Sequence, residues 1–333
     1  MNPSHRASGH RLLLALALLT FGCDDAEPAD AGAPDAGPPM VFDAGAPDAG
    51  GPILDPATFD CTVASATPDR ASARPLHCGL DPACTERLVS AHRGAGAPNS
   101  VFAPEDTLSA IRAAIVIGAD MVELDVRQTS DGALVLIHDD TVDRTTSGTG
   151  EVAAMTLAEV QALEVDVGSL DGDFTCDRVP TMAEALAVAA GRVTLILEPK
   201  VDAIADVVQV LVDEGALDAA ILDISPEQAE AAIAIDPGVR FFVRVEEPAD
   251  VATLQTRFTA NPPRYMHVGD STDAALLAAV DDAGFRVFGL AFGADITADL
   301  RTSPQPYLDR WAQGVQMIQT NRPDRAVAAL ASE

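Results

Sequence analysis

The sequence predicts an α/β protein built as a (β/α)8 barrel, and three observations support this fold class. The chain has 333 residues, and without an N-terminal tail it leaves one large domain of about the length that such barrels need. Short apolar segments alternate with stretches of helical periodicity along residues 88–333, as parallel βα units require. Aromatic residues make up only 4% of the chain, so the core should be mainly aliphatic.

The formal net charge of −30 limits the kinds of molecule that the protein can bind. An acidic body argues against non-specific binding of nucleic acid, which needs basic residues to neutralise phosphates, and it is repelled by anionic membrane surfaces. An anionic small-molecule substrate is compatible with this charge if basic residues are concentrated at the site. The chain contains one lysine, Lys200, and it lies in the segment ILEPK at 196–200.

The first 23 residues predict an export signal. Basic residues precede a short apolar run, LLLALALLTF, which is too short to span a bilayer. Gly22-Cys23 at its end is similar to a bacterial lipoprotein signal, with ordinary secretion as the alternative. We therefore expect an exported bacterial protein at the periplasm or cell surface, attached to a membrane only through a lipid on Cys23.

Two segments separate this signal from the barrel. Residues 24–57 are rich in Asp, Ala, Gly and Pro, cannot bury enough apolar surface to offset the entropy of ordering, and should form a disordered tether. Residues 58–87 form a cysteine-containing extension. If Cys23 carries lipid, four cysteines remain, which predicts two disulfides in one of three connectivities, with zinc as the rival. These four are Cys61, Cys78, Cys84 and Cys176.

Eight segments of residues 88–333 have the pattern of buried parallel strands. They are LVSA at 88–91, MVELDV at 121–126, VTLILE at 193–198, AAILDIS at 219–225, VRFFVRV at 239–245, RYMHVG at 264–269, FRVFGLAF at 285–292 and VQMIQTN at 315–321. A ninth, ALVLIHDD at 133–140, should fold back from the second as an extra limb.

Helices are expected between these strands. Pro104-Glu105-Asp106-Thr107 should begin the first helix, because acidic residues favour a first helical turn. Thr181 should cap another, with Glu184 as its capping-box partner. Further helices are predicted at 203–214, 226–235, 248–258, 271–283 and 305–313 and after Pro323. Residues 141–180, after the His-Asp pair, predict a short insertion over the barrel mouth, with a helix at 155–163.

Polar residues cluster where these strands end. His92 and Arg93 follow the first strand, and alternation places Glu123 and Asp125 on one face of the second. With Glu198, three carboxylates meet at one mouth, where they would repel one another unless a divalent cation joins them. The alternative is that Glu123 or Glu198 only pairs with a nearby base such as Arg93 or Lys200.

The order of these motifs resembles the glycerophosphodiester phosphodiesterase family, a family of phospholipase C-like barrels. The resemblance covers about residues 88–330. It rests on HRG at 92–94, PEDT at 104–107, ELD at 123–125, HD at 138–139 followed by RTTSGTG, VPTMAEAL at 179–186, ILEPK at 196–200 and QTNRPD at 319–324.

The resemblance implies metal-dependent hydrolysis of a glycerophosphodiester to glycerol 3-phosphate and an alcohol. It implies that Glu123, Asp125 and Glu198 bind one divalent cation, Ca²⁺ or Mg²⁺. His92 and His138 would act as the acid–base pair. Arg93 and Lys200 would hold the phosphate oxygens, with Glu105 orienting Arg93 or His92. Asn321 lies where the family often has Asp.

The alternatives are of two classes. A phospholipase D-like or sphingomyelinase-like phosphodiesterase would share the histidines and acids but act on lysolipids or sphingomyelin. A non-catalytic lipoprotein would use the barrel to bind a ligand. The segment FRVFGLAF differs from the one that relatives usually carry near the seventh strand, and this makes Phe288 or Phe292 a candidate for an apolar contact to the substrate.

Overall fold

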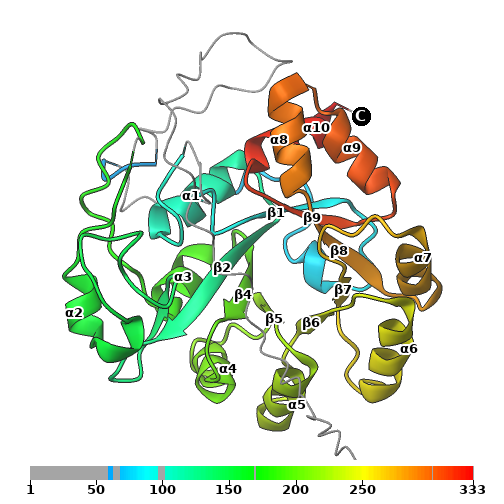
Figure 1. The fold of residues 1–333 in the computed structure, drawn as a ribbon, viewed down its shortest axis with the longest axis horizontal. Coiled ribbons are helices and arrows are strands. Elements are labelled where there is room, and N and C mark those ends of the chain that lie inside the picture. The colour runs from blue at the N-terminus through cyan, green and yellow to red at the C-terminus, as the bar shows by residue number, and fades with distance from the viewer. Residues whose placement is uncertain (1–58, 63–67, 97–101, 169, 302, 333) are drawn as a thin grey trace, which may run out of the picture. The chain divides into compact units, whose positions relative to one another are not determined.

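The structure is a computed structural model that describes residues 59–62, 68–96, 102–168, 170–301 and 303–332. Eight parallel strands form a closed barrel, because β1 pairs with both β2 and β9 (Figure 1). The predicted fold class is therefore confirmed. Around the barrel the strands are β1 (Leu88–Ala91), β2 (Met121–Gln128), β4 (Thr194–Pro199), β5 (Ala220–Asp223), β6 (Phe241–Arg244), β7 (Tyr265–His267), β8 (Arg286–Leu290) and β9 (Met317–Thr320).

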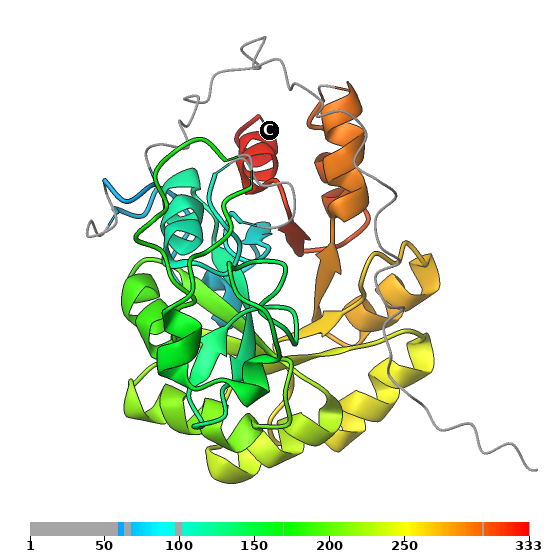
Figure 2. The same cartoon turned by 60° about the vertical axis from the view of Figure 1, so that its left-hand side comes forward.

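Helices alternate with these strands and surround the barrel (Figures 1 and 2). They are α1 (Leu108–Ile117), α3 (Met182–Ala189), α4 (Ile204–Asp213), α5 (Pro226–Ile235), α6 (Pro248–Arg257), α7 (Ala274–Asp282), α8 (Phe292–Arg301), α9 (Gln305–Ala312) and α10 (Pro323–Ala331). The capping box of Thr181 and Glu184 at the start of α3 is confirmed. No helix among the described residues is both long and apolar enough to cross a membrane.

Two predicted boundaries are wrong. Residues 104–107 do not begin α1, which starts at Leu108 with Thr107 as its N-cap. Asp106 has φ +55°, a left-handed conformation that cannot belong to a helix. The seventh predicted strand also ends early, because β8 stops at Leu290 and α8 begins at Phe292.

The barrel interior is more aromatic than the composition suggested. Inward-facing side chains form one buried cluster in which Phe242 and Phe288 lie 4.9 Å apart between ring centroids. Aliphatic residues such as Ile196 and Ile221 complete this cluster. Three of the chain's 14 aromatic residues, Phe242, Tyr265 and Phe288, therefore fill the barrel interior.

The limb predicted from ALVLIHDD is present as β3 (Leu134–Leu136), antiparallel to β2. The insertion that follows carries the short helix α2 (Leu157–Gln161) and a 3-10 turn, η3 (Val152–Ala154). Val142, Val152 and Val160 are fully buried in a small core of its own. The insertion is thus a packed unit beside β2 and β3.

The N-terminal extension contains cysteines of two disulfides, the number that the cysteine count predicted. Cys61 bonds to Cys176 in the insertion, and Cys78 bonds to Cys84 within the extension. Cys78 lies in the short 3-10 helix η2 (Cys78–Leu80), which packs against the barrel interior at the amino-terminal ends of the strands. The signal, tether and Cys23 predicted for residues 1–57 lie outside the described residues and remain predictions.

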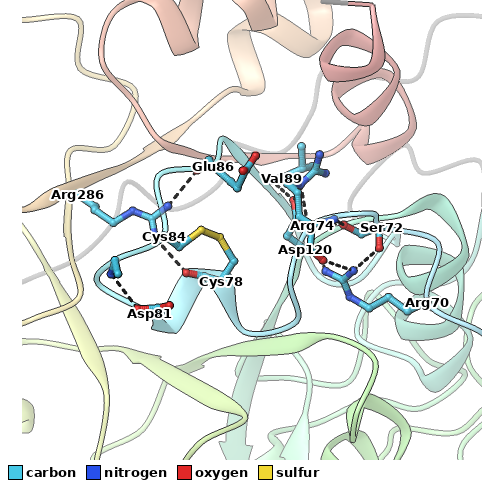
Figure 3. Close-up of a disulfide and its surroundings, with 11 residues drawn as sticks. Arg70, Ser72, Arg74, Cys78, Asp81, Cys84, Glu86, Val89, Asp120 and Arg286 are labelled. Carbon is cyan, nitrogen blue, oxygen red and sulfur yellow. Dashed lines mark hydrogen bonds and ion pairs between the residues drawn. A yellow bond between two sulfur atoms is a disulfide. The ribbon is translucent and has the colours of Figure 1, made fainter.

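Asp120 fastens this extension to the barrel (Figure 3). Its buried carboxylate accepts hydrogen bonds from Arg74 Nε (2.7 and 2.8 Å), the Ser72 hydroxyl (2.7 Å) and the backbone N–H of Val89 (3.0 Å). Arg70 Nη2 lies 3.5 Å from Asp120 Oδ1. One carboxylate at the start of β2 thus joins two arginines of the extension to the base of β1.

Replacing Asp120 should therefore destabilise the whole domain. Asp120→Ala leaves buried donors without an acceptor, and we expect the free energy of unfolding to fall by about 3 kcal/mol or more in urea titrations. The control is Asp218→Ala, which removes an exposed partner of Arg240 and should cost under about 0.5 kcal/mol. Equal losses in the two variants would contradict this role for Asp120.

Candidate active site

The predicted site residues come together at the carboxyl ends of the strands. His92 follows β1, Glu123 and Asp125 lie in β2, and Glu198 lies in β4. The register pairs Asp125 directly with Glu198, so their side chains are neighbours on the inward face. This arrangement follows from strand alternation, which the sequence already indicated.

Glu123, Asp125 and Glu198 each place a carboxylate oxygen within 4.8 Å of the others. Glu123 and Asp125 are buried, and within the described structure Glu123 Oε1 and Asp125 Oδ2 accept no hydrogen bond. Burial, and then the charge of Asp125, holds the pKa of Glu123 well above its usual value. Burial, and then Asp223 on β5, raises the pKa of Glu198 to about 7. Buried hard oxygens that repel one another are suited to a divalent cation.

Two basic residues also reach this cluster. Lys200 Nζ lies 2.6 Å from Glu198 Oε1 and 3.3 Å from Asp125 Oδ1. Arg93 Nε lies 3.3 Å from Asp125 Oδ2, and its Nη1 donates to Glu105 Oε1 at 3.0 Å. The alternative of simple ion pairing is therefore present for Asp125 and Glu198, whereas among the described residues no Lys or Arg side chain lies within 4.0 Å of the Glu123 carboxylate.

The backbone at Arg93 adopts a left-handed conformation with φ +50°. Its N–H donates to Glu123 Oε2 at 3.0 Å, and its carbonyl accepts from Asp106 N–H at 3.1 Å. Gly94 follows with φ +77°, and a Cβ there would lie 2.5 Å from the Cβ of Ala110. Such strained residues persist only where neighbours hold them, and here they aim Arg93 at the cluster.

His92 is held in a defined orientation. Its Nδ1 forms a 2.7 Å hydrogen bond with Asn321 Oδ1, an acceptor, so Nδ1 carries the proton and Nε2 has a free lone pair. Nε2 lies 3.8 Å from Glu123 Oε2. Burial, and then the charge of Arg93, lowers the pKa of His92 to about 4. The ring of Phe292 packs 4.7 Å from that of His92, whereas Phe288 is fully buried in the barrel interior.

Asn321 is fixed by a buried acid that the sequence analysis did not identify. Its backbone N–H donates to Asp295 Oδ2 at 2.8 Å. Asp295 also accepts hydrogen bonds from the Tyr307 hydroxyl at 2.7 Å and from the Thr320 hydroxyl. Burial raises the pKa of Asp295 to about 6. Asp295 thus ties α8 and α9 to the end of β9, which carries the partner of His92.

His138 lies after β3, in an environment that differs from that of His92. Its Nδ1 lies 2.8 Å from Asp139 Oδ1. It is close enough to His92 for its charge to contribute to the lowered pKa of His92. The two predicted histidines therefore have different partners at Nδ1, the carboxylate of Asp139 for His138 and the amide oxygen of Asn321 for His92.

Further polar residues line the mouth without having been predicted. Asp106 is buried, accepts from the Asp125 N–H at 3.3 Å, and has a pKa raised well above its usual value by burial and then by Asp125. On β5 and β7, Asp223 Oδ2 and His267 Nδ1 lie 3.2 Å apart. Strand alternation alone could have identified Asp223 and His267, because both are polar inward positions at strand ends.

Comparisons with known proteins agree with the resemblance drawn from the motifs. The model of the Glycerophosphoryl diester phosphodiesterase family matches residues 92–287. A putative glycerophosphodiester phosphodiesterase of Bacillus subtilis is 45% identical over 113 residues, which are 34% of this chain and 44% of that protein. A glycerophosphodiester phosphodiesterase of Caldanaerobacter subterraneus is 44% identical over 110 residues, or 33% and 43%. The match thus spans under half the length of these curated relatives.

Solved structures extend the likeness across the barrel. A glycerophosphoryl diester phosphodiesterase of Parabacteroides distasonis has a TM-score of 0.64 and 25% identity, covering 74% of this chain and 87% of that one. A phosphodiesterase of Oleispira antarctica, solved with the product sn-glycerol-3-phosphate, has a TM-score of 0.62 and 26% identity, covering 73% and 96%.

The raised pKa of Asp295 predicts a pH dependence of stability. The Asp295 carboxyl group binds its proton more tightly in the folded state than in the unfolded state. Its titration should therefore lower the free energy of unfolding as pH rises from about 4 to about 6. Asp295→Asn removes the titration. In urea titrations, the free energy of unfolding of this variant minus that of the wild type should increase by up to roughly 3 kcal/mol when the pH is raised from 4 to 7.5.

Asp309→Asn on the exposed face of α9 is the matched control and should follow the wild type at both pH values. If Asp295→Asn also keeps a constant offset from the wild type across this range, Asp295 does not titrate as described.

Proposed function

The chain belongs to the glycerophosphoryl diester phosphodiesterase family, and from this premise we propose that it hydrolyses glycerophosphodiesters to glycerol 3-phosphate and an alcohol. The observation that carries the proposal is the pairing of two unlike histidines with one carboxylate cluster at the barrel mouth. The product complex of the Oleispira antarctica phosphodiesterase supports the same class of substrate.

In this proposal His92 is the general base. Its lowered pKa keeps it neutral at physiological pH, and Asn321 holds the proton on Nδ1. Nε2 is then free to take a proton from the attacking hydroxyl, either of water or of the substrate's own glycerol. Asn321 prevents the ring from turning its protonated nitrogen toward the substrate.

His138 is the general acid. Its Nδ1 donates to Asp139, which leaves the opposite nitrogen, Nε2, to give a proton to the departing alkoxide. A choline or ethanolamine alkoxide is a poor leaving group, so this proton is needed for the bond to phosphorus to break. The difference between the two histidine environments thus assigns them opposite roles.

Arg93 and Lys200 bind the phosphate. The Arg93 guanidinium presents a planar fork and Lys200 a point charge, and both already lie beside the carboxylates. Glu105 orients Arg93 through their 3.0 Å hydrogen bond. Glu123, Asp125 and Glu198 would hold one divalent cation, Ca²⁺ or Mg²⁺, which when bound supplies positive charge to the phosphate oxygens.

The test is the release of glycerol 3-phosphate from glycerophosphocholine by the full chain. We expect turnover that is lost with EDTA and restored by Ca²⁺ or Mg²⁺. His92→Ala and His138→Ala should each lower kcat at least about 100-fold, because each removes one proton transfer.

Circular dichroism and cation binding should be unchanged in both histidine variants, which separates chemistry from folding. Cleavage of lysolipid or sphingomyelin in place of glycerophosphocholine would move the protein to the phospholipase D-like alternative. Absence of turnover on all of these substrates would favour the non-catalytic alternative.

A further inference from the structure

Arg144 connects the two halves of the site. Its guanidinium donates to Glu105 through Nη1 and Nη2, both at 2.8 Å. It also donates to Asp139 through Nε at 2.7 Å and Nη2 at 2.9 Å. One planar group therefore binds two carboxylates at once, each through two hydrogen bonds.

These two carboxylates belong to different parts of the site. Glu105 lies in the loop between β1 and α1 and contacts Arg93, the predicted phosphate ligand. Asp139 follows β3 and contacts His138, the predicted general acid. The resulting chain alternates in charge along five side chains: Arg93, Glu105, Arg144, Asp139 and His138.

The insertion holds Arg144 in place. The neighbouring Val142 is fully buried in the insertion's own core, and its N–H donates to the carbonyl of Gly150 at 3.0 Å. The Thr146 hydroxyl donates to the Val142 carbonyl at 2.7 Å. The backbone on both sides of Arg144 is thus anchored, although its side chain is 41% exposed.

We propose that Arg144 is a positioning residue that fixes the general acid His138 relative to the phosphate-binding Arg93. This inference rests on the proposed function of the site. Arg144 holds Asp139 and Glu105 through two hydrogen bonds each, so that neither carboxylate can turn toward the other's partner. Hydrogen bonds from Arg144 are the largest cause of the lowered pKa of Asp139, which therefore stays charged beneath His138.

A lysine cannot replace this arrangement. The Arg144 fork offers donors on two edges in fixed directions, whereas an ammonium group is a single point with no fixed plane. Arg144→Lys should therefore keep the positive charge but lose the simultaneous hydrogen bonds to Glu105 and Asp139. Arg144→Met should lose both.

The experiment compares two leaving groups in the full-length enzyme with its metal restored. Glycerophosphocholine releases an alkoxide that needs a proton, and the glycerophosphodiester of p-nitrophenol releases a phenolate that does not. For Arg144→Lys and Arg144→Met we expect kcat on glycerophosphocholine to fall at least about 30-fold, but less than about threefold on the p-nitrophenyl ester. KM should change little on either.

The ratio of the two rates is measured on one preparation, so it is independent of the fraction of folded protein. The matched control is Arg257→Met, because Arg257 binds Glu230 with two hydrogen bonds and Glu227 with a third on the outer helices α5 and α6. This variant should keep the wild-type ratio.

Equal losses on both substrates, or no loss on either, would overturn the proposal for Arg144. Failure of the wild-type enzyme to cleave either diester would instead refute the proposed function. Asp139→Asn provides the second test. If Asp139 and Arg144 act as one unit, kcat on glycerophosphocholine should be little lower in the double variant Asp139→Asn/Arg144→Met than in either single variant.

Discussion

Three carboxylates crowded into the mouth of a barrel repel one another strongly, because the surrounding protein screens their charges less than water does. Glu123 and Asp125 cannot move apart, since strand alternation fixes both on the inner face of β2. Burial is the largest cause of the raised pKa values of Glu123 and Glu198, followed by the charge of Asp125 for Glu123 and of Asp223 for Glu198. Positive charge must therefore reach the cluster, and much of the site is arranged to bring it there.

The strained turn after β1 serves this requirement. It presents the Arg93 side chain to Asp125 and the Arg93 N–H to Glu123, at the expense of two consecutive left-handed residues. His92, one residue earlier, is largely covered in the same turn, and its pKa is lowered to about 4 by burial and then by the charge of Arg93. His138, on a more exposed limb with Asp139, has no such burial. The turn that brings Arg93 to the cluster thus also gives His92 a less exposed site than His138 has.

The sequence predicted the barrel, β3 and the cluster because these depend on local pattern and on the rule that parallel strands end at one mouth. It could not predict contacts between residues that lie far apart in the sequence. His92 and Asn321 are 229 positions apart, and Cys61 and Cys176 are 115 apart, so neither pairing has a local signal. Helix α8 was not predicted, and its first residue, Phe292, was assigned to the preceding strand because it continues the apolar run of β8. Arg144 was part of a recognised motif, but its two partners emerge only from the fold.

The most direct test of this account is calorimetric titration of Ca²⁺ and of Mg²⁺ into chelator-treated protein, for the wild type and for Glu123→Gln. We predict one cation per wild-type chain and an affinity at least about tenfold weaker in the variant, because a buried ligand oxygen loses its charge. Saturable binding of equal strength in both proteins, or no binding to the wild type, would contradict the assignment of the carboxylate cluster as the cation site.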